Sequence, residues 1–95
     1  MGSTPLHRAA CKGHVKLAKL LLSYNADPYI QDLEGNTPLH LACEDEEYDT
    51  SKLLVENGAS TTVKNKNEKT PLHLAPLSLK RQLERLMMVN NIPTQ

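Results

Sequence analysis

The sequence repeats one tetrapeptide, TPLH, at residues 4–7, 37–40 and 70–73. The copies are evenly spaced, and we call the step from Thr4 to Thr37 and from Thr37 to Thr70 the repeat period. A catalytic site is needed once and gives no reason to copy the neighbouring threonine, proline and leucine. A fixed period of this length instead indicates one supersecondary unit stacked several times, because each unit buries its apolar face against the next. We therefore predict a stack of three units.

The first half of the second copy, residues 32–64, contains the signals of a short helix. DLEG at 32–35 is a turn sequence, in which the aspartate can bond its own backbone and the glycine supplies positive φ. Thr37 is a favourable N-cap, and Pro38 is favoured at the first helical position, where its missing N–H costs nothing. The apolar residues that follow recur at helical spacing. This pattern predicts a helix that begins at Thr37.

The second half of this copy predicts another helix, which returns antiparallel to the first. The acidic run at 44–47 is expected to form the turn between the two helices. The second helix should run from about Tyr48 to Asn57 and be closed by Gly58 in the left-handed conformation. An extended segment then leads to the next turn. Each unit is thus a helix, a turn, a second helix and a protruding hairpin.

The first and third copies follow the same pattern with two departures. Asn25 replaces the closing glycine, and asparagine tolerates the left-handed conformation better than most residues. In the third copy Pro76 should stop the first helix near Ala75. A final helix is expected over residues 78–91, with one apolar and one charged face. A charged outer face is what the end of a solenoid needs.

These features predict an all-α fold, a solenoid of three helix-turn-helix repeats with hairpin loops. We expect one domain over residues 1–95, with repeats at about 1–31, 32–64 and 65–95 and the last repeat as the C-terminal cap. The chain contains no Phe or Trp and three Tyr. Its core must therefore be built from Leu, Ala and Val, which suits short helices in close contact.

The repeat period, the TPLHxAA start and the LLVENGA end resemble the ankyrin repeat over the whole chain. Two longer segments, IQDLEGNTPLHLAC and NKNEKTPL, are similar to the C-terminal repeats of the gankyrin family of proteasome-assembly chaperones. This resemblance implies a non-catalytic protein-binding module without a cofactor, in the cytoplasm and also in the nucleus. It implies the C-terminal domain of a proteasomal ATPase as the partner. The alternative is a generic ankyrin module from an unrelated scaffold or kinase-inhibitor protein.

The composition argues against two other classes of partner. The chain has 11 basic and 11 acidic residues and a formal net charge of zero, so it lacks the positive surplus that drives binding to nucleic acid. No apolar run approaches the roughly 20 residues of a membrane span.

Two cysteines do not make a disulfide scaffold, and we expect a buried Cys43 and a surface Cys11.

Three of the four histidines, His7, His40 and His73, stand at the same point of each repeat. A metal ladder in a metal-dependent enzyme is one interpretation. Equivalent side chains of stacked helices lie roughly 8–10 Å apart, however, whereas zinc holds its ligand nitrogens at about 2.0–2.1 Å. We therefore expect each imidazole to hydrogen-bond backbone and tie the hairpin to the helix. His14 is expected to cap the turn into the second helix.

The acidic run Glu44–Glu47 could be a solvated turn or an acidic patch for a partner. It lacks the alternating ligands and central glycine of an EF-hand-type loop. Consecutive carboxylates on a tight turn are also poor candidates for acid–base catalysis, which needs burial or a neighbour to shift the pKa. The two non-catalytic interpretations stay open at this point.

A partner is expected to bind the concave face formed by the hairpins and the first helices of the repeats. The charged residues of this face are grouped by sign along the stack. Arg8 and Lys12 are basic, the middle turn is acidic, and the third hairpin is basic again. Such patterns mainly set specificity and association rate. The candidate binding residues are Ser3, Arg8, Cys11, Lys12, Gln31, Leu33, Glu34, Asn36, Glu44, Asp45, Lys64, Lys66, Asn67 and Lys69.

The sequence opens inside what would be a hairpin, which we interpret as a fragment of a longer protein. An internal repeat buries the outer side of its helices against the preceding repeat. We therefore expect Leu6, Ala9 and Leu21 to be partly uncovered in this chain, and the bare surface to favour association.

Overall fold

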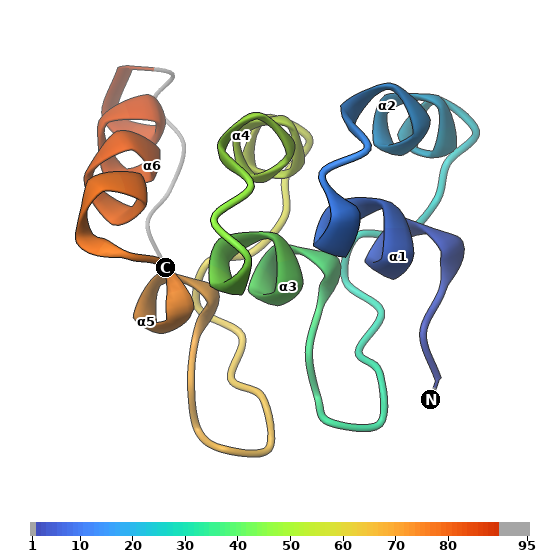
Figure 1. Cartoon of the computed structure of the whole chain (residues 1–95), viewed down its shortest axis with the longest axis horizontal. Coiled ribbons are helices and arrows are strands. Elements are labelled where there is room, and N and C mark those ends of the chain that lie inside the picture. The colour runs from blue at the N-terminus through green and yellow to red at the C-terminus, as the bar shows by residue number, and fades with distance from the viewer. Residues whose placement is uncertain (1, 90–95) are drawn as a thin grey trace.

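A computed structural model describes residues 2–89, which contain six helices and no strand. Helices α1, α3 and α5 form an inner row and α2, α4 and α6 an outer row, and two long connections reach away from the helices as hairpins (Figure 1). The neighbouring pairs α1–α3, α3–α5, α2–α4 and α4–α6 are in contact. The bounds are α1 Pro5–Lys12, α2 Val15–Ser23, α3 Pro38–Glu44, α4 Tyr48–Glu56, α5 Pro71–Leu74 and α6 Leu77–Val89. This is the predicted all-α stack of helical pairs.

Each inner helix begins at the threonine of its TPLH copy, as predicted. In α3 the Thr37 hydroxyl accepts a hydrogen bond from the backbone N–H of His40, and the His40 imidazole accepts one from the N–H of Thr37 at 3.0 Å. The same reciprocal bonds join the capping threonine and the histidine of α1 and α5. Two orphan amides of each first turn are thereby satisfied, which is the purpose of a capping box. Here histidine takes the place usually held by glutamate or glutamine.

The helix ends also lie close to the predicted positions. Asn25 and Gly58 follow α2 and α4 in the left-handed region, with φ of 67° and 89°. Pro76 limits α5 to four residues, and the chain is extended at Ala75. The last helix begins at Leu77, one residue before the predicted start. Its predicted end, at residues 90 and 91, lies outside the described residues.

The cap predicted at His14 lacks a side-chain hydrogen bond. His14 occupies the N-cap position of α2, but its exposed side chain makes no capping hydrogen bond. The backbone N–H of His14 instead donates to the carbonyl of Ala9 at 2.9 Å. His14 is thus the N-cap residue, as predicted, but the turn from α1 to α2 is held by its backbone and not by its imidazole.

The core runs as one apolar cluster through all three helical pairs. Its largest members with less than 2% exposure are Leu6, Leu39, Leu54, Leu79, Leu83 and Met87. Ala9, Ala10, Ala42 and Cys43 are also almost fully buried. Such small side chains let the inner helices approach closely, so the three pairs share a continuous interior.

The first repeat is better covered than expected. Leu6 and Ala9 are each 1% exposed, so the expectation that they would be partly uncovered was wrong. Both belong to the core cluster, and α1 packs on α2 and α3. Neighbours within the chain therefore suffice to bury them. Leu21 is half-buried, as expected.

Thr50 on α4 is a local defect in this interior. It is 1% exposed, and its hydroxyl has no hydrogen-bond partner among the described residues. A buried polar group without a partner costs about 1–3 kcal/mol. We expect Thr50→Val, which keeps the side-chain shape, to raise the free energy of unfolding in urea by about 1 kcal/mol. Thr50→Ser keeps the hydroxyl and removes a methyl group, so a gain in that variant as well would contradict this explanation.

Candidate protein-binding surface

Two buried histidines, one on α1 and one on α3, each connect their helix to the hairpin that leads into the next repeat. The Nε2 atom of His7 lies 2.8 Å from the carbonyl oxygen of Asn36, and that of His40 lies 2.9 Å from the carbonyl oxygen of Lys69. Both side chains are 0% exposed. Since Nδ1 accepts from the capping N–H, the proton is on Nε2, which donates to the carbonyl. These contacts are the backbone ties predicted for the TPLH histidines.

Burial lowers the pKa of His40, with the hydrogen bond to the Lys69 carbonyl opposing this shift. The unfolded chain therefore takes up this proton at a higher pH than the folded protein does, near the ordinary imidazole pKa of about 6.5. The contribution of His40 to stability is thus complete above this pH and is lost as the pH falls toward the lower folded pKa.

We expect the urea concentration at the unfolding midpoint to decrease as the pH is lowered from about 7.5 to about 5.5, and to decrease less in the His40→Gln variant. His14→Gln is the matched control, because it makes the same substitution at an exposed side chain without a capping hydrogen bond. An unaltered pH dependence in His40→Gln would contradict the assignment to His40.

The hairpins are held by side chains at equivalent positions, Asp32 and Asn65. The Asp32 carboxylate accepts from the N–H groups of Glu34 and Asn36, each at 2.9 Å. The Asn65 amide oxygen accepts from the N–H groups of Asn67 and Lys69, at 2.9 and 3.0 Å. Each side chain thereby closes its own turn, as was expected for Asp32. Asn65 was not singled out in the sequence, although its position one repeat period after Asp32 was a signal for the same role.

The two hairpins are also joined to each other. Asn65 donates through Nδ2 to the Asn36 side-chain oxygen at 2.9 Å. The Lys66 N–H donates to the Glu34 carbonyl at 2.9 Å. Gln31 donates to the carbonyls of Gly35 and Lys64 at 2.9 and 3.3 Å. The hairpins therefore form one connected platform, which fixes the spacing of the side chains at its surface.

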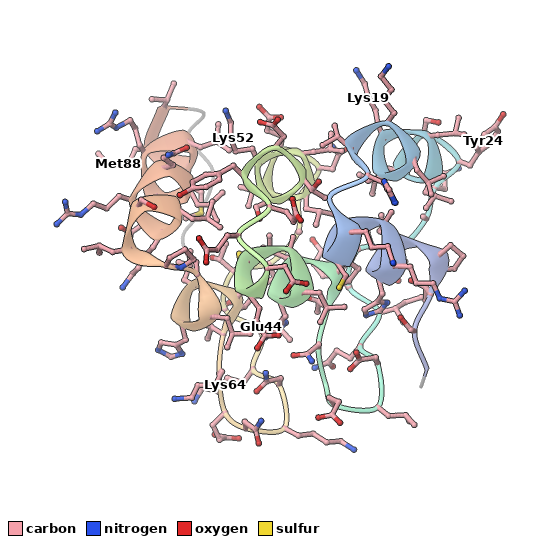
Figure 2. All side chains as sticks on the ribbon, in the orientation of Figure 1. Lys19, Tyr24, Glu44, Lys52, Lys64 and Met88 are labelled. Atoms are coloured by element: carbon pink, nitrogen blue, oxygen red, sulfur yellow. The ribbon has the colours of Figure 1, made fainter. Side chains whose placement is uncertain are left out.

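The sequence-predicted binding residues come from the segment before α1, from α1, from the end of α3 and from two hairpins, the first between α2 and α3 and the second between α4 and α5. Figure 2 shows Glu44 at α3 and Lys64 on this second hairpin. The half-buried members are Ser3, Cys11 and Asn36. The exposed members are Arg8, Lys12, Gln31, Leu33, Glu34, Glu44, Asp45, Lys64, Lys66, Asn67 and Lys69. Gln31 and Asn36 are engaged in joining the hairpins, so their side chains are less free than those of the exposed charges.

The acidic turn is largely in solvent, with Glu44, Asp45 and Glu46 exposed and Glu47 half-buried. Asp45 also contacts the neighbouring repeat, because the Cys11 thiol donates to its Oδ2 at 2.9 Å. This hydrogen bond, followed by burial, raises the pKa of the Cys11 thiol. Burial raises the pKa of Cys43 to about 12. Both shifts favour the neutral thiol, which is the unreactive form.

Residues 2–89 contain no group of three or more His, Cys, Asp or Glu side chains that could hold a metal ion. Within the same residues, no helix is both long enough and apolar enough to cross a bilayer. Across this surface the structure shows charged and amide side chains displayed on a connected platform, rather than groups that converge on one reacting atom.

The helical pairs are stacked, their hairpins are joined, and the charged residues of α1, the end of α3 and the hairpins form an exposed surface, which we call the inner surface. This arrangement defines a helical-repeat binding module. A family model described as ankyrin repeats (3 copies) matches residues 6–88. The chain therefore belongs to the ankyrin-repeat family. Ankyrin repeats indicate a module for protein–protein interaction, and such domains are generally non-catalytic.

Proposed function

We propose that the chain is a protein-binding module of gankyrin type, with the C-terminal domain of a proteasomal ATPase as its partner. In this proposal the chain acts in regulatory-particle assembly, in the cytoplasm and also in the nucleus. The proposal rests on the similarity of IQDLEGNTPLHLAC and NKNEKTPL to the gankyrin family. Both segments contain hairpin residues of the candidate surface.

The observation that supports a specific partner is the sorted charge on this surface. Arg8 and Lys12 are exposed on α1, Glu44 and Asp45 at the end of α3, and a lysine group on the second hairpin. The described residues include one ion pair among these charges, Lys64 with Glu68 at 3.7 Å, and both of its side chains are largely in solvent. Most of the charges are thus available to a partner. A complementary partner presents acidic, basic and acidic groups in the same order.

The test is binding of a purified proteasomal ATPase C-terminal domain, measured by titration calorimetry at low and high salt. Charge reversal at the middle of the surface, Glu44→Lys, and on the hairpin, Lys66→Glu, should each weaken binding about tenfold or more, or about 1.4 kcal/mol. The weakening should shrink at high salt. Lys19→Glu is the matched control, because Lys19 is exposed on the outer helix α2.

Two results would overturn parts of this proposal. If the ATPase domain does not bind at all, the gankyrin-type assignment fails, and a module of an unrelated scaffold or kinase inhibitor becomes the better explanation. If the domain binds and Lys19→Glu weakens binding as much as Glu44→Lys does, the inner surface is not the binding site.

A further inference from the structure

The exposed large apolar side chains avoid the middle helical pair, α3–α4. Within residues 2–89 they fall on the first repeat, on the hairpin between α2 and α3, and on α6. They are Leu17, Leu20, Tyr24, Tyr29, Ile30, Leu33, Leu77, Met88 and Val89. Figure 2 shows Tyr24 and Met88 at opposite ends of the stack. The apolar surface left uncovered is therefore concentrated at the two ends.

At the α1–α2 end, most of the uncovered positions are ones that the middle repeat buries or half-buries, and Tyr24 is the exception, because the equivalent Asn57 is exposed. Leu17 is 44% exposed, whereas Thr50, one repeat period later, is 1% exposed. Pro5 is exposed, whereas Pro38 is buried. The difference has a structural cause, because α3 and α4 pack on α1 and α2. We define the leading face as Pro5, Leu17, Leu20, Leu21, Tyr24, Ala26 and Ile30.

The leading face includes a shallow apolar groove of about 180 Å³. The groove is lined by Pro5, Leu21, Ala26 and Ile30, among others. The residues equivalent to Leu21 and Ala26 in the middle repeat, Leu54 and Ala59, are 0% and 7% exposed. The surface therefore has the composition of an internal repeat–repeat contact.

The α5–α6 end offers the complementary half of the same contact. His73 makes the usual capping bond, in which its Nδ1 accepts from the Thr70 N–H at 3.1 Å. Its side chain is exposed, and its Nε2 has no hydrogen-bond partner within the described part of the chain. In His7 and His40 this atom bonds a carbonyl of the next repeat.

Exposed apolar side chains accompany His73 at this end. Leu77 is 62% and Met88 79% exposed, and their spacing along α6 is that of one helix face. The intervening positions on this face are Arg81 and Glu84, which are exposed and opposite in charge. We define the trailing face as His73, Leu77, Arg81, Glu84 and Met88.

We propose that the leading face of one copy binds the trailing face of a second copy, so that the chains associate head to tail. The bond expected across this contact joins His73 Nε2 of one copy to the Ser3 carbonyl of the next. Ser3 stands one repeat period before Asn36, which accepts the equivalent bond from His7. The second copy thus continues the interface already present between repeats, with the same imidazole donor and with Arg81 and Glu84 at two positions that are apolar in the first repeat.

The contact should be weaker than the internal ones, because Arg81 and Glu84 must lose water when they are covered. It is also heterologous, since two different faces meet, and nothing in such a contact limits the assembly to a dimer. The average mass should therefore rise continuously with protein concentration. This association uses the ends of the stack and, apart from Ser3, leaves the candidate binding residues free for a protein partner.

Sedimentation equilibrium tests the proposal over a wide range of concentration. The average mass of the wild-type chain should rise to about twice the monomer mass of 10.6 kDa or more. Leu20→Glu blocks the leading face and Leu77→Glu the trailing face, and each variant alone should remain monomeric. An equimolar mixture of the two should form dimers and nothing larger, because one intact face of each kind remains.

Leu33→Glu is the matched control, since Leu33 is 57% exposed on a hairpin and belongs to neither face. It should associate like the wild type. Leu17→Glu and Met88→Glu provide a second variant of each face if thermal melts show that a first variant is poorly folded.

Three results would overturn the proposal. A wild-type chain that stays monomeric at all concentrations would exclude self-association. A dimer that survives Leu77→Glu but not Leu20→Glu would show two leading faces in contact. If Leu33→Glu lost association as much as Leu20→Glu and Leu77→Glu do, the chains would be held together by nonspecific hydrophobic association and not by a defined contact.

Discussion

Replacing Leu39 by alanine is expected to lower the free energy of unfolding by about 2–5 kcal/mol. Leu39 lies on α3 and is 0% exposed. Helix α3 contacts α1, α4 and α5, so a cavity at this position weakens contacts with both neighbouring repeats. Small domains have total stabilities of about 5–15 kcal/mol, so this single loss is a large fraction of the total. Urea unfolding followed by circular dichroism measures it.

Two other truncations calibrate this result. Leu53→Ala should cost less than Leu39→Ala, because Leu53 is half-buried, whereas its neighbour Leu54 is fully buried. Lys66→Ala should change stability by less than about 0.5 kcal/mol, as an exposed substitution does. Equal losses at Leu39, Leu53 and Lys66 would contradict the packing described above.

The sequence was most informative where one residue type has a local physical role. Threonine before proline predicted the start of each inner helix, because the cap and the missing N–H act within one turn. Asn25 and Gly58 predicted helix ends, and Pro76 predicted the short α5, for equally local reasons. These effects need no knowledge of what packs nearby, so they could be predicted from the sequence.

Burial was harder to predict, since it depends on which neighbours cover a side chain. The repeat period predicted that Leu6 and Ala9 would be partly uncovered, but contacts with α2 and α3 bury them. Spacing along α4 did not distinguish Leu53 from Leu54 either, because both fall within the width of an apolar stripe. The difference between them depends on how α2, α3 and α6 pack around α4.

The candidate surface was predicted only in part, because some of its features are local in sequence and others depend on contacts between repeats. Its exposed charges follow from position in the repeat, and Asp32 was recognised as a turn residue. The bonds between the two hairpins were not foreseen, because Asn65 to Asn36 and Lys66 to Glu34 join residues about one repeat apart. These hydrogen bonds form only if the two hairpins lie side by side at the right distance, and the local sequence does not determine that distance.

Gly35 offers the most direct test of that contact between hairpins. Its φ is +81°, in the region that favours glycine. A Cβ atom there would lie 2.8 Å from the Lys66 backbone nitrogen and 3.0 Å from Asn65 Cα. Both contacts are with backbone, so relieving them requires the second hairpin to move. That movement would stretch the bond from the Lys66 N–H to the Glu34 carbonyl.

Gly35→Ala is therefore expected to destabilise the fold by more than the left-handed conformation alone requires. The conformation costs about 1–2 kcal/mol, and forced displacement of packed backbone adds about 1–3 kcal/mol. Gly58→Ala is the matched control, because its φ is +89° but its nearest neighbour would be the Tyr29 hydroxyl at 3.7 Å. That variant should lose only the conformational part. Equal losses in urea unfolding of the two variants would show that the hairpins are not in firm contact, and the connected platform proposed for partner binding would then lack its support.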